Sequence, residues 1–225
     1  MSLTLYGSPL SPFVRKTRVV LAEKGLDYTL DPVNVFAPPP EFLAISPLKR
    51  IPVLRDTSVG PDATLPDSSA ICAYLEKKQP EPALYPAVPF DYARVLWFEE
   101  YADSELASLC GMGVFRPIVV NSLMGNGPDR EAADKTMTEK MPRLFDYLNR
   151  EIGDNAFLVG GRFSVADIAV ATHFVNLAHA GYAPDEASYP ALRRFLTAIH
   201  ARPSFASLIA DERKMLASLG ISYAL

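Results

Sequence analysis

The sequence predicts an α/β domain followed by an all-helical domain. Residues 1–79 mix short strand patterns with helix patterns, whereas the apolar residues of 90–225 lie almost wholly at helical spacing. Residues 80–89 lie between them as a proline-rich linker, which is stiff and interrupts regular structure. The length of 225 residues suits one large domain or two modest ones, at roughly 100–200 residues each.

Composition and charge exclude several classes of protein. Hydrophobic residues make up 49% of the chain and charged residues 21%, a balance typical of a compact protein and not of a disordered or fibrous one. The net charge is −4 and no basic cluster is present, which argues against a nucleic-acid partner. Proline is the outlier, because 20 prolines in 225 positions are nearly twice the usual usage of about 5%.

The N-terminus and the apolar runs predict a cytoplasmic protein with no membrane partner. The first charge is Arg15, so the N-terminus lacks the positive flank of a signal peptide. No apolar run is expected to approach the roughly 18 residues that cross a bilayer. Cys72 and Cys110 are too far apart for a CxxC motif, and the histidines lack metal-ligand spacing. We therefore expect neither a metal site nor a disulfide framework.

Each element of the α/β domain has a local signal. The best defined is a helix from Pro12 to Lys24, because Ser11 is a good N-cap, Pro12 fits the first turn and Gly25 can end the helix. The other expected elements are a strand at 3–6, a strand at 28–35, a short helix at 41–45, a strand at 52–55 and a helix at 69–78 that is capped by residue 67 or 68.

The order of these elements predicts a small mixed sheet. The first two strands are joined by a helical crossover and the last two by a turn, with residues 63–65 as a very short fourth strand. Val14 and Leu21 give the first helix an inward face. The side chains expected on its other face are Arg15, Lys16 and Arg18.

The second half is predicted to be a helical bundle. A long helix over 90–123 is expected to bend or end near Pro117, and a helix that follows residue 128 to kink at Pro142. Ser164 and Asp167 form a capping box, and the helix it begins is apolar nearly all round, as is typical of the centre of a bundle. Further helices are expected from Pro190 and after Arg202.

Short motifs in a fixed order connect these elements to a known family. They are Ser11-Pro12-Phe13-Val14-Arg15-Lys16, Ile51-Pro52-Val53-Leu54, Asp67-Ser68-Ser69-Ala70-Ile71, Ser164-Val165-Ala166-Asp167, and Tyr189-Pro190 with Arg202-Pro203-Ser204-Phe205. Together, on both sides of a proline-rich linker, they resemble the cytosolic glutathione S-transferases from end to end. The resemblance implies a thioredoxin-like N-terminal domain with a four-stranded mixed sheet, an all-α C-terminal domain and a homodimer.

The resemblance also implies glutathione as co-substrate and a small electrophile as its partner. A free thiol has a pKa of about 8.5, so the site must favour the thiolate. Ser11 is the candidate catalytic residue, because a hydroxyl at a helix N-terminus can donate its proton to a thiolate. Ser8, in the same turn, is the competing candidate, and an ordinary helix cap is the structural alternative for Ser11. Phe13 is assigned to glutathione binding by the same motif.

Two further segments are implied to hold the tripeptide. The resemblance makes Pro52 a cis-proline, which leaves the backbone of Ile51 to pair with the cysteinyl segment; a plain edge-strand proline is the alternative. Asp67 and Ser68 correspond to the pair that takes the γ-glutamyl end, although many relatives have Glu in place of Asp67, and both could simply cap a helix.

The glycyl end has the weakest support. Arg50 aligns with a basic residue that meets the glycyl carboxylate in some relatives, whereas a solvated surface arginine is the equal alternative, and Lys49 is the weaker choice. The stretch 36–40 departs from the family, because it lacks the lysine, histidine or glutamine that several classes place there.

Several residues of the second half have structural interpretations. Ser164 and Asp167 are interpreted as folding residues. Cys72, in the first half, is expected in the core, and Cys110 either in the bundle core or at the family's electrophile pocket. The bulky residues Trp97 and Tyr101 are expected in the core or at dimer contacts.

The resulting hypothesis is a glutathione transferase that attacks a hydrophobic electrophile. A glutathione-dependent isomerase or dehalogenase is the enzymatic alternative, although the serine-serine-cysteine turn of maleylacetoacetate isomerases is absent. A non-catalytic glutathione-binding adaptor is the alternative from another class, since fold alone does not fix function.

Overall fold

The computed structural model describes residues 3–221. The chain divides into two compact units, Met1–Tyr85 and Pro86–Leu225, and the division falls inside the proline-rich segment.

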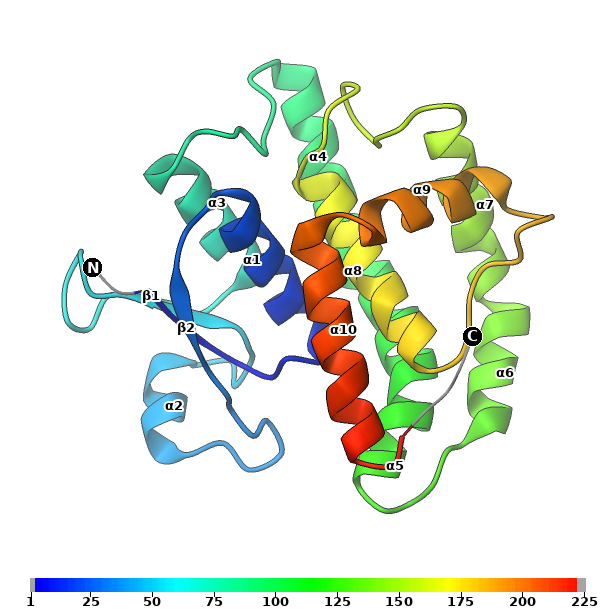
Figure 1. The fold of residues 1–225 in the computed structure, drawn as a ribbon, viewed down its shortest axis with the longest axis horizontal. Helices are drawn as coiled ribbons and strands as arrows, with labels where there is room; N and C mark the ends of the chain where they lie inside the picture. The colour runs from blue at the N-terminus through cyan, green and yellow to red at the C-terminus, as the bar shows by residue number, and fades with distance from the viewer. Residues whose placement is uncertain (1–2, 222–225) are drawn as a thin grey trace. The chain divides into compact units, whose positions relative to one another are not determined.

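The first unit is built on a four-stranded mixed sheet, as predicted (Figure 1). The strands are β1 (Leu3–Tyr6), β2 (Tyr28–Asp31), β3 (Val53–Asp56) and β4 (Thr64–Leu65), in the order β2-β1-β3-β4. β1 is parallel to β2 and antiparallel to β3, which is antiparallel to β4. β2 is shorter than the predicted 28–35, because Pro32 has no N–H with which to continue the ladder.

Three helices complete this unit: α1 (Pro12–Glu23), α2 (Pro40–Ile45) and α3 (Ser68–Lys78). α1 ends as predicted, with Gly25 in the left-handed region at φ 62°. α1 and α3 pack against each other. Of the three basic residues placed on the other face of α1, Arg15 and Lys16 are fully buried and Arg18 is partly exposed. The helical period of α1 marks its apolar face but does not reveal that α3 covers another.

Ionic contacts join the far ends of α1 and α3. Lys24, just after α1, forms a 2.7 Å ion pair with Glu76 of α3. Its ammonium also donates to the carbonyls of Gln79, at 2.7 Å, and Pro82, at 3.0 Å. Three acceptors are therefore held by one buried cation, which fixes the chain where it leaves α3.

A buried carboxylate connects the end of β3 to α3. Asp56 accepts hydrogen bonds from the hydroxyl of Tyr74 at 2.5 Å and from the backbone and hydroxyl of Ser58 at 2.9 and 2.5 Å. Lys78 completes the cluster with an ion pair of 2.7 Å. Burial raises the pKa of Asp56, but the bonds from Lys78, Ser58 and Tyr74 outweigh it and hold that pKa well below its usual range.

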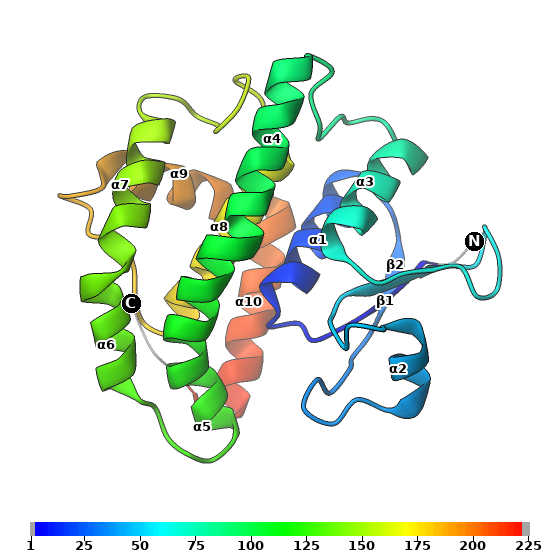
Figure 2. The same cartoon turned by 180° about the vertical axis from the view of Figure 1, so that it is seen from behind.

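The second unit is all-helical, as predicted. Figure 2 shows its longest element, a continuous helical stretch formed by α4 (Pro89–Tyr101), η1 (Ala102–Val120) and α5 (Asn121–Leu123). The remaining helices are α6 (Arg130–Glu139), α7 (Met141–Ile152), α8 (Val165–His179), α9 (Pro190–His200) and α10 (Pro203–Ser218).

Two prolines of this unit lie where a helix continues or begins, so the long helix does not end at Pro117 and the expected kink at Pro142 is wrong. The long helix continues past Pro117, within η1, where the turns are wider and the N–H of Asn121 reaches the carbonyl of Arg116, five residues back. Pro142 does not kink a helix but lies in the first turn of α7, where its missing N–H needs no partner. The preceding helix ends at Glu139, before Pro142, so α6 and α7 are separate helices.

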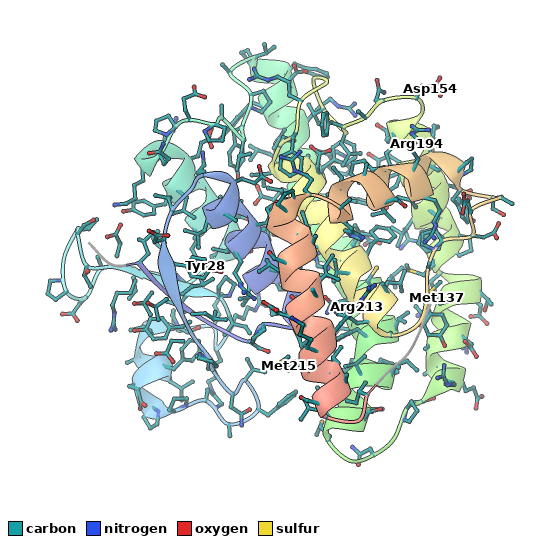
Figure 3. All side chains as sticks on the ribbon, viewed as in Figure 1. Tyr28, Met137, Asp154, Arg194, Arg213 and Met215 are labelled. Carbon is teal, nitrogen blue, oxygen red and sulfur yellow. The ribbon has the colours of Figure 1, made fainter. Side chains whose placement is uncertain are left out.

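α8 is the centre of the unit. Every residue of α8 except Ala178 is buried, and the helix packs against α4, η1 and α9. Its predicted capping box is present, since Asp167 accepts from the N–H of Ser164 at 2.8 Å. Asp167 also accepts from the N–H of Leu158 at 2.8 Å, which anchors the preceding loop. Another loop is held from α9, where Arg194 donates to the carbonyl of Gly153 at 2.6 Å (Figure 3).

One stretch of the second unit departs from the expectation about apolar runs. Among the described residues, the helical stretch 89–123 is long and apolar enough to cross a membrane by length and composition. Part of the reason is that Arg116 is the only charged residue between positions 106 and 123. Core helices of globular domains meet the same criteria, and this stretch packs against α6 and α8.

Candidate active site

The turn between β1 and α1 places Ser11 at the start of a helix of 12 residues. Ser11 has an extended backbone, with φ −72° and ψ 128°, and its half-buried hydroxyl accepts from the N–H of Val14 at 3.4 Å. A hydroxyl that accepts this bond can still donate its own proton to another group. The first N–H groups of α1 and the positive end of its dipole lie at the same point, so an anion is favoured there.

Gly7 allows this turn to run close to its neighbours. A Cβ at Gly7 would lie 2.4 Å from Cγ2 of Val14 and 3.5 Å from Cβ of Ile51. The first distance is shorter than side-chain atoms tolerate, so any larger residue at this position would have to displace the buried side chain of Val14. The second distance shows that the turn passes beside Ile51. Ser8, the competing candidate, is half-buried in the same turn, where its carbonyl accepts from the N–H of Ser11 at 3.0 Å.

The second segment of the site precedes β3. The Ile51–Pro52 peptide bond is cis, as the resemblance implies, and Pro52 is buried while Ile51 is half-buried. The antiparallel register pairs Tyr6 with Val53. The chain that leaves β1 towards Ser11 and the chain that enters β3 after Ile51 therefore lie at one edge of the sheet.

Packing and a hydrogen-bond clamp hold the chain before Ile51. Val33, Phe42 and Val53 form a buried cluster against which Ile51 packs, together with Tyr6 and Ile45. Ser46, which the sequence analysis missed, donates to the carbonyl of Arg50 at 2.7 Å and accepts from its N–H at 3.0 Å. The signal that could have found it is a serine directly after the predicted short helix, since serines at such positions bond to nearby backbone.

The basic residues beside the cis-proline are both exposed. The side chain of Arg50 reaches solvent, while its backbone is held by Ser46. Lys49 has a left-handed backbone at φ 55°. The stretch 36–40 lies just before and at the start of α2.

The third segment is the start of α3. Asp67 is its N-cap and accepts from the N–H groups of Ser69 and Ala70, both at 2.9 Å. The helix-cap interpretation of Asp67 is thus confirmed, and because Asp67 is exposed, this cap leaves it open to solvent. Ser68 is buried as the first residue of an 11-residue helix. Its position suits a carboxylate at the helix N-terminus.

A side-chain contact brings the first and third segments together. The ammonium of Lys16, in α1, donates to the hydroxyl of Ser69, in α3, at 3.1 Å. The starts of α1 and α3 therefore lie at the same end of the unit, with the cis-proline segment at the sheet edge beside them. Two positive helix ends and an exposed acid meet there, which suits a ligand with carboxylates and an ammonium. Phe13 lies in the first turn of α1 and is half-buried.

The remaining sequence candidates are structural. Cys72 and Cys110 are both fully buried and unbridged, and burial raises the pKa of Cys110 to about 12. This agrees with the core interpretation of both cysteines. Trp97 is not a core residue, since 52% of it is exposed. Within residues 3–221 no cluster of three or more histidine, cysteine or acidic side chains could hold a metal ion.

The fold and the position of the candidate site define a class. The first unit is a thioredoxin-like domain, and an all-helical unit follows it. Residues 5–83 match the family "Glutathione S-transferase, N-terminal domain", and residues 114–212 match "Glutathione S-transferase, C-terminal domain". The chain is 31% identical over 217 residues to glutathione S-transferase 3 of Zea mays, covering 92% of this chain and 93% of the relative. The protein therefore belongs to the glutathione S-transferase family of enzymes.

Other similar proteins show how varied this family is. FtsZ-localized protein A of Caulobacter vibrioides is 28% identical, covering 92% of this chain and 91% of its own. A maleylacetoacetate isomerase of Pseudomonas aeruginosa is 30% identical, covering 84% and 87%. The crystal structure of a glutathione S-transferase from Rhodospirillum rubrum F11 has a TM-score of 0.83 and 29% identity, covering 92% of this chain and 91% of that one.

Proposed function

We propose that this protein is a glutathione transferase in which Ser11 stabilises the glutathione thiolate. The observation that carries the proposal is the position of Ser11, at the N-cap of α1 beside the cis-proline edge, in a chain of this family. Lowering a thiol pKa by about two units requires roughly 2.7 kcal/mol. One charge-assisted hydrogen bond of about 1.5–3 kcal/mol, with about 0.3–1 kcal/mol from the helix dipole, is sufficient. The thiolate, and not the serine, then attacks a hydrophobic electrophile.

The same proposal assigns the tripeptide to the three segments. The backbone of Ile51, next to Pro52, pairs with the cysteinyl part of glutathione as an added strand does. Ser68 and the start of α3 hold the γ-glutamyl carboxylate, and the exposed carboxylate of Asp67 faces its ammonium. Arg50 meets the glycyl carboxylate, because it follows the Ser46 clamp and its side chain is exposed.

Isomerisation or dehalogenation is the second candidate reaction. It is favoured by the similarity to a maleylacetoacetate isomerase and uses the same activated thiolate. The chain lacks the serine-serine-cysteine turn of that group, which favours conjugation. A non-catalytic adaptor is the candidate from another class, and a relative named for its localisation with FtsZ gives that candidate its support.

We further propose a homodimer in the cytoplasm. Phe90 and Trp97, on one side of α4, are 73% and 52% exposed, and an apolar helix face of this kind is suited to a second copy. Trp97 is held in place, since its indole N–H donates to the hydroxyl of Tyr147 at 2.7 Å. The two buried, unbridged cysteines are compatible with a reducing compartment.

Binding and turnover together test the proposal. The purified chain is applied to immobilised glutathione and assayed with 1-chloro-2,4-dinitrobenzene as a generic aryl halide. Retention with turnover is expected. Retention without turnover of this or a second class of electrophile would favour the adaptor, and absence of both retention and turnover would overturn the glutathione site.

A further inference from the structure

Two consecutive basic residues come directly before Ile51. Lys49 and Arg50 are both exposed, and within residues 3–221 neither forms an ion pair with an acidic side chain. Several other basic residues of the chain do pair with a carboxylate, namely Lys24, Lys78, Arg94 and Arg143. Two positive charges therefore remain available for an anion beside the cis-proline segment.

The backbone of both residues is fixed by the turn before them. The N–H of Lys49 donates to the carbonyl of Ser46 at 2.9 Å, and the buried hydroxyl of Ser46 holds the carbonyl and the N–H of Arg50 at 2.7 and 3.0 Å. Pro47 lies at the second position of this turn, where its fixed φ is favourable. A ligand that binds to such a segment orders few further groups, so more of each contact is realised as affinity.

Lys49 has an unusual backbone for a lysine. At φ 55° it is the only residue other than glycine with a positive φ in the described part of the chain. Glycine takes this conformation freely, whereas a residue with a Cβ is strained in it. Because Lys49 is exposed, packing does not account for a lysine at this position. Strained residues of this kind cluster at ligand sites, which suggests a binding function for its side chain.

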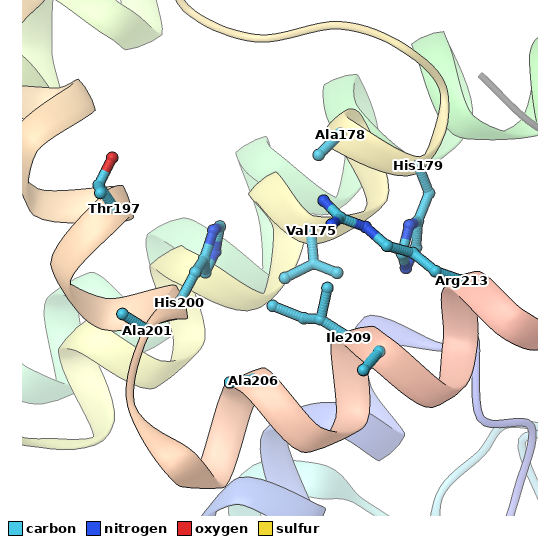
Figure 4. A pocket seen from close by; sticks show the side chains of 10 residues that line it. Val175, Ala178, His179, Thr197, His200, Ala201, Ala206, Ile209 and Arg213 are labelled. Atoms are coloured by element: carbon cyan, nitrogen blue, oxygen red, sulfur yellow. The ribbon is translucent and has the colours of Figure 1, made fainter. Parts of the chain in front are cut away.

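The basic residues of the helical unit have a different setting. A cavity of about 360 Å³ is formed by α8, α9 and α10, and its basic lining residues are His179, His200 and Arg213 (Figure 4). Nε2 of His179 lies 2.8 Å from the carboxylate of Glu212, and Nε2 of His200 lies 2.9 Å from the carbonyl of Ala171. Both imidazoles are therefore held by neighbouring helices. The cavity contains none of the residues assigned to glutathione.

We propose that the tripeptide site accepts a thiol tripeptide with an acidic C-terminal residue, γ-glutamylcysteinyl-glutamate, as well as glutathione. This inference rests on the proposed function, in which the backbone of Ile51 pairs with the cysteinyl part. When the two chains run antiparallel, the residue after the cysteine lies opposite Arg50, the residue before Ile51. The guanidinium suits the terminal carboxylate, since it can offer two parallel N–H donors. The flexible ammonium of Lys49 then meets the second carboxylate, on the side chain of the ligand.

Isothermal titration calorimetry of the full chain with three S-hexyl tripeptides tests this inference. They are S-hexylglutathione and its two analogues with glutamate or glutamine in place of the glycine. The glutamate and glutamine ligands differ by one charge at nearly equal size. At low ionic strength we expect the glutamate ligand to bind about fivefold more tightly than the glutamine ligand, as for one exposed ion pair. Arg50→Met should weaken all three ligands, because they share the terminal carboxylate.

Variants at position 49 show which cation causes the preference. Lys49→Met should abolish the preference for the glutamate ligand, whereas Lys49→Arg should retain it. Lys49→Gly places a residue suited to the left-handed backbone at this position, so it should abolish the preference with the fold intact. Lys77→Met is the matched control. This exposed cation lies in the last turn of α3, at the opposite end from Ser68, and its loss should leave the preference as it is.

A preference that survives in both Lys49→Met and Lys49→Gly would overturn the inference. Equal affinity of the wild type for the glutamate and glutamine ligands would overturn it as well. In either case S-hexylglutathione would still bind, and the proposed function would stand. Absence of binding by all three ligands would instead overturn the proposed glutathione site, and this inference with it.

Discussion

The ammonium of Lys16 lies 3.1 Å from the hydroxyl of Ser69, and through this contact the starts of α1 and α3 are joined. Lys16 is fully buried, although it lies on the face of α1 opposite the apolar residues Val14 and Leu21. The contact matters for function because Ser11 begins one of these helices and Asp67 begins the other. The distance between the two ends of the proposed glutathione site therefore depends on a buried cation.

Removal of Ser11 should lower activity in a chain that still folds, with a loss of about 1 kcal/mol of stability because Ser11 is the N-cap of α1. Ser11→Ala removes the proposed hydrogen bond to the thiolate, so kcat/KM for the aryl halide should fall by about ten- to a hundredfold at neutral pH. The apparent thiol pKa in the pH–rate profile should rise by about one to two units. Ser8→Ala, in the same turn, is the matched control. A profile that moves with Ser8→Ala and not with Ser11→Ala would transfer the role to Ser8.

The charge of Asp67 can be separated from its capping function. Asparagine is as good an N-cap as aspartate, so Asp67→Asn should keep the free energy of unfolding within about 0.5 kcal/mol while raising the KM for glutathione. Asp67→Ala should raise the KM for glutathione and should also lower the free energy of unfolding by about 1 kcal/mol, because the cap is lost. Steady-state kinetics with denaturant unfolding measures the two effects. If Asp67→Asn leaves KM as it is, Asp67 is only a cap.

Lys16 and Ser69 should be energetically coupled. The single variants Lys16→Met and Ser69→Ala each remove the contact, and their effects on the free energy of unfolding should not add. A coupling energy of about 1–2 kcal/mol is expected for a partly buried hydrogen bond to a cation. The double-mutant cycle is read by urea unfolding. Strict additivity would show that the two side chains are neighbours without interacting.

Asp167 should make the helical unit less stable as pH rises. Burial raises the pKa of Asp167 to about 6, against the lowering effect of bonds from Leu158 and Ser164. The unfolded carboxyl loses its proton near pH 4, so the native state binds more protons between pH 4 and 6, and stability falls across that window. The penalty of Asp167→Asn relative to wild type should therefore shrink by about 2–3 kcal/mol from pH 4 to pH 7. A penalty that grows with pH would contradict the raised pKa.

Asp56 should show the opposite dependence. Its folded pKa lies below that of the unfolded chain, because bonds from Lys78, Ser58 and Tyr74 outweigh burial. The contribution of ionised Asp56 to the free energy of unfolding is therefore present above about pH 4 and is lost as the pH falls further. The destabilisation caused by Asp56→Asn should be largest at neutral pH and should decline in acid. The free energies of unfolding of Asp56→Asn and Asp167→Asn, each compared with the wild type over the same pH series, test this difference. If the penalties of the two variants change in parallel with pH, the opposite pKa shifts of Asp56 and Asp167 are refuted.

The elements with strong local signals were predicted closely. Ser11, Pro12 and Gly25 bound α1 where the sequence placed them, and the capping box of Ser164 and Asp167 begins α8. Capping and turn chemistry act over a few residues, so they can be recognised without the fold. β2 was predicted too long because apolar alternation continues past the proline that ends its ladder.

The residues that tertiary contacts control were missed. Ser46 was overlooked because its bonds to Arg50 form only when the chain after α2 turns back upon itself. The cavity of α8, α9 and α10 was not anticipated, because its basic residues come from three helices that are apart in sequence. The continuation of the helix past Pro117 depends on packing against other helices of the unit, which a local helix-breaking rule does not include.

The sequence by itself determined the two-part architecture, the mixed sheet and the family, because caps, prolines and apolar periods are local patterns that recur in a fixed order. Only the tertiary structure decided that Arg15 and Lys16 are buried, that Trp97 is exposed, and that three separate segments meet at one edge of the sheet. These facts depend on which helix covers which face. Whether a residue is buried depends on which elements pack against it after folding. The helical period of a sequence identifies the apolar face of one helix and does not identify the element that will cover it.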